Sequence, residues 1–334
     1  MRRYDLAARQ QLALRENAPV PVPGPGEVLV RVGACTVCNR SDLVYYHFLG
    51  LREHCAQGCF GHEISGTVER AGEQVTGLAP GDRVFVRTPL TSGYADYALA
   101  RRVAVGALPD GIPFEHGAIL QLLPLAVHAT RGVRLGDRVA ILGQGPVGLM
   151  ALQVTRRRGA SEVAVADLDP WRLARSRQLG AGLAVRVEAA GQDPAPGGYD
   201  ALGGEFDVAI DAVGTPATVN ACVSLIRPGG LIVMLGTHHV DTRVSFDLVS
   251  WEKKGLRAHS SAEPTDPARA QAMTVAERLA ATIDLAALYT GSYPLTRLPE
   301  AIGRLSDSGV LHPAGSPAAA GGPPPRTLKL AIVP

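Results

Sequence analysis

The segment that decides the fold runs from Arg138 to Gly148 and reads RVAILGQGPVG. Its first five residues form an apolar strand pattern, a glycine-rich turn follows, and a helical pattern then continues to about Arg158. An apolar strand, a G-x-G-x-x-G turn and a helix in this order are the phosphate-binding unit of a dinucleotide-binding sheet. The turn alone would be weak evidence in a chain with 38 glycines, but its context makes the prediction of a dinucleotide site specific.

The three glycines of the turn have different roles in such a site. The first glycine, Gly143, makes the tight turn, Gly145 lets the backbone approach a pyrophosphate, and Gly148 lets the helix pack closely on the strand. Pro146 and Val147 open the helix, whose positive N-terminus would hold the pyrophosphate. We therefore predict that these five residues bind the cofactor.

An acidic residue ends the next predicted strand. Asp167 lies nineteen residues after Gly148, where a carboxylate accepts hydrogen bonds from the ribose hydroxyls of NAD(H). A 2′-phosphate at that place would be repelled by Asp167, whereas the nearby Arg172 would attract it. The pattern favours NAD(H) and leaves NADP(H) open, with both side chains assigned to the cofactor site.

The pattern around this segment predicts a parallel sheet. Further apolar runs at 162–166, 206–211 and 230–236 are separated by helical patterns, as in α/β folds whose sheet is covered on both faces. Before about residue 115 the chain instead shows short strand patterns between turns rich in Gly and Pro. We predict a separate β-rich domain for that part.

Composition and charge limit the partners of the chain. It has 334 residues, about two domains by length, and 33 Lys and Arg against 31 Asp and Glu leave a formal charge of +2. So small a net charge, without a basic run, predicts no nucleic-acid and no membrane partner. The first residues contain no apolar signal-peptide core, and five cysteines do not suggest a disulfide framework. We expect a cytoplasmic protein.

Metal-type side chains occur at two places in the β-rich part. The first is CTVC over residues 35–38, followed by Ser41 and Asp42, and the second is GHEISG over residues 61–66. A lone cysteine is most often a small buried hydrophobic residue, and a lone histidine is most often a hydrogen-bonded structural one. A CxxC pair can also be a redox couple, but such pairs lie near a βαβ pattern, whereas this one lies in a β-type region. Spacing alone leaves metal binding at these two places undecided.

Together these motifs resemble the zinc-dependent medium-chain alcohol and polyol dehydrogenases. The resemblance covers nearly the whole chain, and its most specific marks are Cys38 with Ser41 and Asp42, GHEISG at 61–66, PGDRV at 80–84, GDRV at 136–139 and the turn at 143–148. It implies an α/β fold in which a doubly wound Rossmann sheet is inserted in a β-rich, GroES-like catalytic domain. The implied domains are 1–122 (catalytic), 123–275 (dinucleotide-binding) and 276–334 (return to the catalytic domain), with the active site in the cleft between the two domains.

The resemblance also implies one catalytic zinc ion. In this family a Cys, the His of the G-H-E element and a later Cys or Glu hold the metal, and Cys38 and His62 match the first two. Glu63 resembles a carboxylate that approaches the metal. In polyol-type members a Glu stands seven residues before a His, but here Gln121 holds that place before His128, and a neutral amide oxygen is a poorer zinc ligand. Three alternatives stay open: zinc held by the first three side chains with Gln121 or water, weak ligation by Gln121, or a site that has lost its metal.

Other roles come from the resemblance alone. Zinc would act as a Lewis acid on the substrate oxygen, and Ser41 would accept the proton of the alcohol. His47 would be an outer proton relay, with an exposed loop histidine as the equal alternative. Asp42 would orient the ring of His62. The residues expected to line the nicotinamide are Val213, Leu235, Gly236 and Thr237.

The function that the resemblance predicts is an NAD(H)-dependent oxidoreductase that interconverts a secondary alcohol, of polyol, sugar or aminocyclitol type, and its ketone. Two alternatives are a zinc-free reductase of quinones or activated double bonds, which usually lacks both the Cys and the His, and a nucleotide-binding protein without catalysis. No cysteine occurs between Cys59 and Cys222, so we expect no structural zinc. The family also suggests a homodimer or homotetramer.

Overall fold

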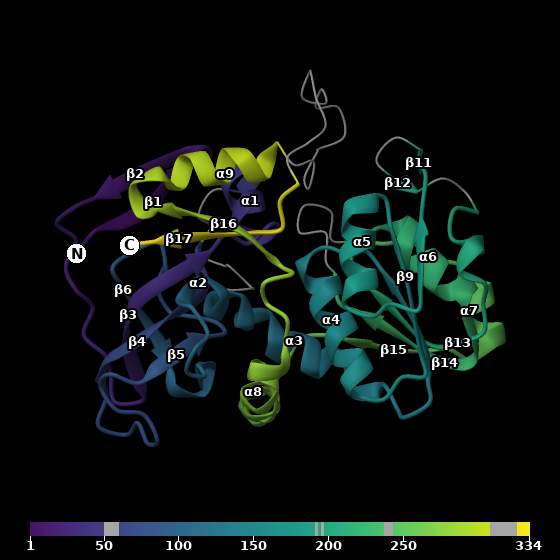
Figure 1. Ribbon diagram of the computed structural model, residues 1–334, viewed down its shortest axis with the longest axis horizontal. Coiled ribbons are helices and arrows are strands. Elements are labelled where there is room, and N and C mark those ends of the chain that lie inside the picture. The colour runs from purple at the N-terminus through teal and green to yellow at the C-terminus, as the bar shows by residue number, and fades with distance from the viewer. Residues whose placement is uncertain (50–59, 191–192, 195–196, 237–242, 308–325) are drawn as a thin grey trace. The chain divides into compact units, whose positions relative to one another are not determined.

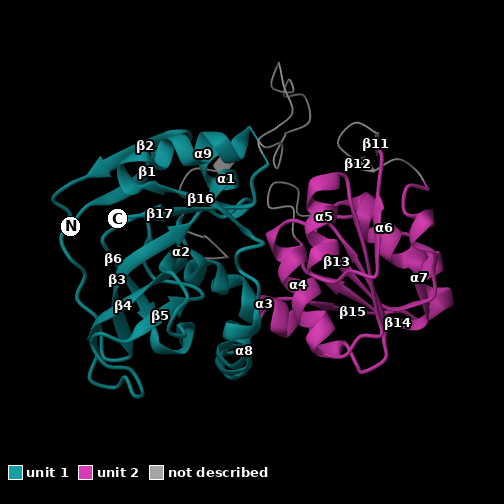
Figure 2. Cartoon of the chain, in the orientation of Figure 1, with its two compact units in different colours: residues 1–124, 264–334 teal, residues 125–263 magenta. Residues whose placement is uncertain are grey.

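The computed structural model describes residues 1–49, 60–190, 193–194, 197–236, 243–307 and 326–334 of the chain. They form two compact units, Met1–Pro124 with Pro264–Pro334, and Leu125–Glu263 (Figure 1, Figure 2). Along the chain, the second unit is therefore inserted in the first. None of the described helices is both long enough and apolar enough to cross a lipid bilayer.

A parallel sheet forms the centre of the inserted unit. Its strands follow the order β10 (Leu183–Arg186), β9 (Glu162–Asp167), β8 (Arg138–Leu142), β13 (Phe206–Asp211), β14 (Ile226–Met234) and β15 (Arg257–Ser260). Every pair of neighbours in this order is parallel. The chain runs outward from β8 through β9 to β10 and then returns to β13 on the other side of β8. This is the doubly wound topology that the sequence predicts.

Helices cover both faces of this sheet. Side chains alternate between the two faces of a strand, and alternate residues of β8 belong to two different hydrophobic cores. One core includes α6 (Pro216–Leu225), and the other includes α4 (Pro146–Arg157) and α5 (Pro170–Gln178). Strands buried on both faces need apolar residues at every position, which is why these runs do not alternate with polar residues. The remaining elements of the unit are η4 (Thr130–Gly132), β11 (Ala189–Ala190), β12 (Asp193–Pro194), η5 (Asp200–Leu202) and α7 (Leu248–Lys254).

The other unit is built on a mostly antiparallel sheet. Its order is β16 (Tyr289–Pro294), β17 (Lys329–Val333), β3 (Glu27–Thr36), β4 (Glu63–Ala71), β5 (Arg83–Val86) and β7 (Val105–Ala107), with β6 (Tyr97–Arg101) also paired to β3. Only β16 and β17 pair in parallel among these strands of the described chain. The last strand, β17, lies directly beside β3, so the end of the chain completes the sheet that its first hundred residues begin.

Shorter elements surround this second sheet. A hairpin of β1 (Arg3–Ala8) and β2 (Gln11–Arg15) packs its apolar residues into the same core as β3, β4 and α9 (Leu298–Ser306). The other elements are α1 (Ser41–Val44), η1 (Tyr45–Leu49), η2 (Arg102–Ala104), α2 (Phe114–Gly117), η3 (Ala118–Gln121), α8 (Asp266–Leu279), η6 (Ala280–Thr282) and η7 (Leu295–Arg297); α3 (Leu122–Ala129) carries the chain into the inserted unit. The predicted α/β fold, with a β-rich GroES-like part and a Rossmann sheet, is confirmed.

The unit boundaries differ from the implied domains at one point. The first boundary, after Pro124, lies close to residue 122, but the second follows Glu263 and not residue 275. The difference is α8, which packs on β7 and η2 of the mostly antiparallel unit. Glu277 Oε1 accepts a hydrogen bond from the backbone N–H of Ala107 at 2.8 Å. These contacts join residues far apart in sequence, so no local pattern marks the boundary.

The two glycines of the G-H-E-x-x-G element meet steric limits of this fold. Gly61 has φ +73, and a Cβ there would lie 2.7 Å from the ring of Tyr94. Gly66 lies in the middle of β4, and a Cβ there would lie 2.0 Å from the carbonyl oxygen of Arg31 on β3. The motif therefore supplies the glycine that allows β4 to pair closely with β3, in addition to its His and Glu side chains.

We predict that Gly66→Ala lowers the free energy of unfolding by about 3 kcal/mol, because the new methyl group has no space beside the β3 backbone. Gly303→Ala is the matched control, since Gly303 lies within α9 with no atom within 4 Å of an added Cβ. That control should be neutral or gain about 0.5–1 kcal/mol from helix propensity. Urea unfolding of both variants measures the difference, and equal stabilities would contradict the steric argument.

Candidate active site

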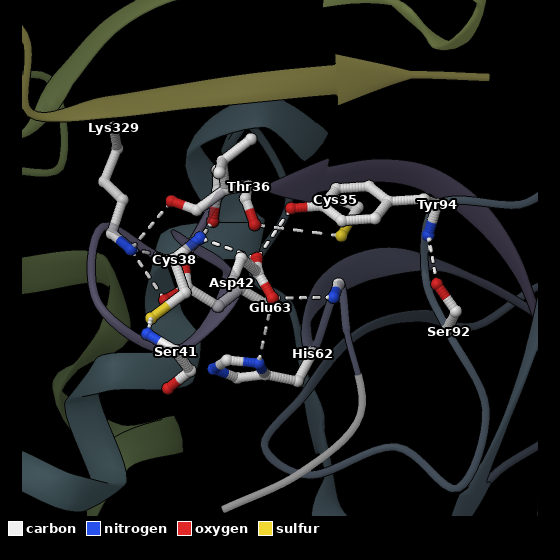
Figure 3. A network of polar contacts seen from close by, with 12 residues as sticks. Cys35, Thr36, Cys38, Ser41, Asp42, His62, Glu63, Ser92, Tyr94 and Lys329 are labelled. Carbon is white, nitrogen blue, oxygen red and sulfur yellow. Dashed lines mark hydrogen bonds and ion pairs between the residues drawn. The ribbon is translucent and has the colours of Figure 1, made fainter. Parts of the chain in front are cut away.

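Three potential metal ligands meet where β3 ends and β4 begins. Cys38 follows β3 by two residues, and His62 and Glu63 stand at the start of β4, where Glu63 is paired with Thr36. One ligand atom from each of Cys38, His62 and Glu63 lies within 4.8 Å of the other two (Figure 3). Among the described residues, this is the group of Cys, His and carboxylate side chains whose spacing suits a metal ion. The antiparallel register brings together residues more than twenty positions apart.

Asp42 organises the polar network behind this group. Its carboxylate is fully buried and accepts hydrogen bonds from the backbone N–H of Cys38 and of Gly61, both at 2.9 Å. The hydroxyl of the buried Tyr94 donates to the same carboxylate at 2.6 Å. His62 Nδ1 lies 3.8 Å from Asp42 Oδ1. Asp42 therefore fixes the backbone on either side of the cysteine–histidine pair and faces the imidazole ring, as expected for a residue that orients it.

Glu63 has a different set of partners. The ammonium group of Lys329, on β17, lies 2.6 Å from both Glu63 oxygens, and Thr36 Oγ1 also donates to Oε2. Lys329 Nζ donates as well to the carbonyl oxygen of Val37, at 3.2 Å. Glu63 and Lys329 are 0% and 2% exposed, so this is a buried ion pair. It connects the last strand of the chain to the loop that carries Cys38.

Burial and neighbouring charges shift the pKa values of the members of this group. Burial and the charge of Glu63 raise the pKa of the Cys38 thiol, but Lys329 and His62 outweigh them and hold it below its usual range. Burial lowers the pKa of His62, yet Cys38, Asp42 and Glu63 together raise it to about 9. Burial also raises the pKa of the Asp42 carboxyl. A lowered thiol pKa favours the thiolate, which is the form of cysteine that binds metals.

Two predicted proton carriers lie on the segment after Cys38. Ser41 begins α1, is buried, and its backbone N–H points to Cys38 Sγ at 3.4 Å. His47 lies on η1, where its Nε2 is 2.7 Å from Ser306 Oγ of α9 and its Nδ1 is 3.5 Å from Gln10 Nε2. Burial lowers the pKa of His47. The structure thus brings Ser41 to the cysteine, while the relay role of His47 stays a prediction.

Gln121 is the residue expected near the third ligand position. It ends η3, which packs against β3, β4 and β5. Its side chain is 3% exposed, and its Oε1 has no hydrogen-bond partner among the residues that the structure describes. Buried amide oxygens nearly always have a partner in folded proteins. Gln121 therefore carries an uncommitted acceptor.

The glycine-rich turn of the inserted unit has the geometry that the sequence predicts. Gly143 has φ +89, which favours glycine, and a Cβ on Gly148 would lie 1.9 Å from the carbonyl oxygen of Gly143. Gly145 is the N-cap of α4, and Pro146 is its first residue, followed by Val147. The N-terminus of α4 is thus preceded by a turn without side chains at the positions that crowd it, as phosphate binding requires.

Asp167 lies at the end of β9, close to this turn. Its Oδ2 accepts a hydrogen bond from the backbone N–H of Gln144 at 2.6 Å, and its Oδ1 accepts one from Asp169 at 2.8 Å. Arg172 Nη1 is 4.0 Å from Asp167 Oδ2, and Arg172 Nε is 3.7 Å from Asp169 Oδ2. The carboxylate thus supports the turn itself and retains acceptor capacity, since an ionised carboxylate has about four acceptor sites.

The residues expected at the nicotinamide follow β13 and β14. Asp211 Oδ1 accepts a hydrogen bond from the N–H of Val213 at 2.9 Å, and the Asp211 carbonyl oxygen accepts those of Leu235 and Gly236. A Cβ on Gly236 would lie 2.3 Å from the backbone nitrogen of Val213. Three of the four residues are therefore neighbours; the fourth, Thr237, lies outside the described residues.

Sequence reasoning missed three residues that touch this site. Thr36 and Lys329 hold Glu63, and Tyr94 holds Asp42. Lys329 gives a signal, because it is one of three lysines in the chain and stands in an apolar run. A lysine in a buried strand needs an anionic partner. Thr36 and Tyr94 are common strand residues, and nothing in the local sequence distinguishes them.

Comparison with known proteins agrees with this geometry. Residues 24–120 match the model of the alcohol dehydrogenase GroES-like domain, and residues 146–277 match that of the zinc-binding dehydrogenases. Human sorbitol dehydrogenase is 33% identical over 253 residues, which are 66% of this chain and 71% of that enzyme. The chain belongs to the zinc-dependent medium-chain dehydrogenases. The predicted family and its alcohol dehydrogenase/reductase class are thereby confirmed.

Solved structures of similar fold cover the whole chain of this medium-chain dehydrogenase. A protein assigned as a zinc-binding dehydrogenase from Sinorhizobium meliloti, bound to NADP, superposes with a TM-score of 0.77 at 25% identity, over 100% of this chain and 99% of that one. Galactitol-1-phosphate dehydrogenase from Escherichia coli has a TM-score of 0.79 at 22% identity over 100% of both chains. The second likeness concerns the fold alone.

We predict that Tyr94→Phe destabilises the protein by about 2 kcal/mol, because it leaves the buried Asp42 carboxylate without one of its donors. The ring of Phe would keep the packing of Tyr94 against Phe60. Tyr97→Phe, at a half-buried tyrosine of β6, is the control and should change stability by less than about 0.5 kcal/mol. Urea unfolding compares the two variants, and an unaffected Tyr94→Phe would show that the hydroxyl contributes nothing.

Proposed function

We propose that this medium-chain dehydrogenase interconverts a secondary alcohol of polyol type and its ketone, with NAD(H) as the hydride carrier and one zinc ion at Cys38 and His62. The observation that carries the proposal is the group formed by the half-buried Cys38 thiol and the buried imidazole and carboxylate of His62 and Glu63, beside Asp42. The likeness of the chain to human sorbitol dehydrogenase supports a polyol as the substrate class. We further propose a homodimer or homotetramer, as the family suggests, and a cytoplasmic location. We also propose that the chain has no structural zinc, because no cysteine occurs between Cys59 and Cys222.

The donor set fits a zinc ion. Thiolate sulfur, imidazole nitrogen and a side-chain oxygen are the ligand types of catalytic zinc sites, which keep one position open for substrate. Cys38 and His62 would supply the sulfur and the nitrogen. Two side chains compete for the third protein position: Glu63, which lies within 4.8 Å of both, and Gln121, whose buried oxygen has no partner in the described chain.

When bound, zinc would supply Lewis acidity that lowers the pKa of the alcohol, and NAD(H) would supply the hydride-carrying ring. The residues of the chain would position the ligand atoms and transfer the proton. Asp42 holds the His62 ring and the Cys38 backbone, so the ligand atoms keep their positions through turnover. Ser41, buried beside Cys38, would take the alcohol proton at Oγ and release it toward the ribose hydroxyls. His47 would serve as an outer relay.

For the cofactor we propose NAD(H), with NADP(H) as the weaker ligand. Asp167 would accept hydrogen bonds from the ribose hydroxyls with the acceptor capacity that its two backbone contacts leave. Arg172 would reduce the repulsion of a 2′-phosphate, although its guanidinium is already close to two carboxylates. Gly143, Gly145, Pro146, Val147 and Gly148 would bind the pyrophosphate; Val213, Leu235, Gly236 and Thr237 would line the nicotinamide.

We predict that Cys38→Ala abolishes turnover and removes zinc from the purified protein, while NADH affinity changes by less than about threefold, because the thiolate belongs to the metal site and not to the cofactor site. Cys222→Ala, at a buried cysteine of α6, is the control and should keep both zinc and activity. Metal analysis and NADH titration measure the effects. Full turnover in Cys38→Ala would rule out the proposed zinc mechanism.

We predict that Asp167→Ala weakens NAD binding by about tenfold or more, since a hydrogen bond to a charged acceptor contributes about 1.5–3 kcal/mol. The carboxylate also supports the turn, so both cofactors lose that part equally. The ratio of NAD to NADP affinity isolates the ribose contact, and it should fall by about tenfold. Calorimetric titration of both cofactors provides the ratio. An unchanged ratio would assign Asp167 to the turn alone.

A further inference from the structure

A buried glutamine stands inside the glycine-rich turn of the inserted unit. Gln144, between Gly143 and Gly145, is 0% exposed, so its side chain packs inside the unit and not toward solvent. Its Nε2 donates hydrogen bonds to the carbonyl oxygens of Gly143, at 2.9 Å, and of Ile141, at 3.3 Å. Its Oε1 accepts one from the hydroxyl of Ser176, on α5, at 2.9 Å. Both ends of the side-chain amide therefore have partners.

The peptide group between Gly143 and Gln144 is held at both ends by side chains. Its carbonyl oxygen accepts from Gln144 Nε2, and its N–H donates to Asp167 Oδ2 at 2.6 Å. The preceding peptide group, between Leu142 and Gly143, is instead held by backbone groups of β9 and of the residue that follows β13. At the first peptide group beyond the strand, side chains thus replace the backbone partners that the sheet provides.

The orientation of this peptide group matters for the helix that follows. The carbonyl oxygen of Gly143 lies beside the first turn of α4, 1.9 Å from the place of a Cβ on Gly148. Glycine permits a half-turn rotation of the peptide group, which would point its oxygen at the Asp167 carboxylate and its N–H at another donor. Such a rotation would change the groups that face the N-terminus of α4, where an anion binds.

We propose that Gln144 is a positioning residue for the cofactor, whose side-chain amide locks the Gly143–Gln144 peptide group, and with it the turn, in the conformation that receives the pyrophosphate. The inference rests on the dinucleotide site of the proposed function. Gln144 acts here without touching the cofactor, since its amide is buried and already bonded. Ser176 keeps the amide in its orientation, because an inverted amide would point its oxygen at two carbonyl oxygens.

This role predicts a loss of affinity that is the same for both cofactors. NAD and NADP share the pyrophosphate and differ at the ribose, which Asp167 and Arg172 face in the proposed function. Loosening the turn should therefore weaken both and leave the ratio of their affinities unchanged. Adenosine, which carries the ribose but no phosphate, should bind as it does to the wild type. Asp167→Ala, by contrast, should change the ratio.

The first test is Gln144→Met, which keeps a side chain of similar length and removes its hydrogen bonds. We expect the affinities for NADH and NADPH each to fall by about tenfold, as for buried acceptors left without their donor. Their ratio and the competition by adenosine should change by less than about twofold. Calorimetric titration measures binding under conditions where urea unfolding shows the variant to be folded. Gln178→Ala, at the exposed last residue of α5, is the control and should keep all three affinities.

The second test is Ser176→Ala, alone and combined with Gln144→Met. The single variant leaves Gln144 Oε1 without its donor, so the affinity for NADH should fall by about threefold. In the double variant the loss should be no larger than in Gln144→Met, because both changes act through the same amide. Ser176→Ala also keeps the inference testable if Gln144→Met fails to fold.

The outcomes separate this inference from the proposed function. If folded Gln144→Met or Ser176→Ala binds NADH as the wild type does, the amide only stabilises the fold and the inference fails, while the dinucleotide site stands. A changed ratio of NADH to NADPH, an equal loss for adenosine, or additive losses in the double variant would also contradict it. If the wild type binds neither cofactor, the proposed function itself is wrong.

Discussion

The buried contact between Lys329 and Glu63 is the constraint on which the rest of this site depends. It joins residues 266 positions apart, and neither charge can stay buried without the other. Because Glu63 is paired with Thr36 across the β3–β4 ladder, the contact also fixes the strand ends next to Cys38 and His62. The last strand must therefore lie beside β3 before the site is complete. The final segment of this discontinuous unit thus supplies the buried cation at Glu63, and the first hundred residues contain no lysine.

Local signals account for the part of the fold that the sequence predicts well. The turn at Gly143 to Gly148 is defined by backbone conformations and close approaches that only glycine allows, so its residue types report its geometry directly. The apolar runs of β8, β9 and β13 reflect burial on both faces of a parallel sheet. The GHEISG element is informative for the same reason. Gly61, just before β4, lies close to the ring of Tyr94, and Gly66, within β4, lies close to the backbone of Arg31.

Long-range contacts account for what the sequence does not reveal. The unit boundary after Glu263 depends on where α8 packs, and the partners of Glu63 and Asp42 come from β17 and from the segment before β6. Threonine and tyrosine are common in strands, so no sequence pattern reveals the contact of Thr36 with Glu63 or of Tyr94 with Asp42. The relay role of His47 stays a prediction; its ring nitrogens lie beside Ser306 and Gln10, which are distant from it in sequence.

The two buried carboxylates beside the cysteine–histidine pair, Asp42 and Glu63, differ in their hydrogen-bond partners. Asp42 receives neutral donors and faces the imidazole, whereas Glu63 receives an ammonium group; both carboxylates, together with Cys38, raise the pKa of His62. The anionic surroundings raise the pKa of His62 to about 9, so the metal-free ring carries a proton at neutral pH. A metal needs the neutral imidazole, and its binding must release that proton. The anionic groups that raise the pKa of His62 would also attract the metal cation.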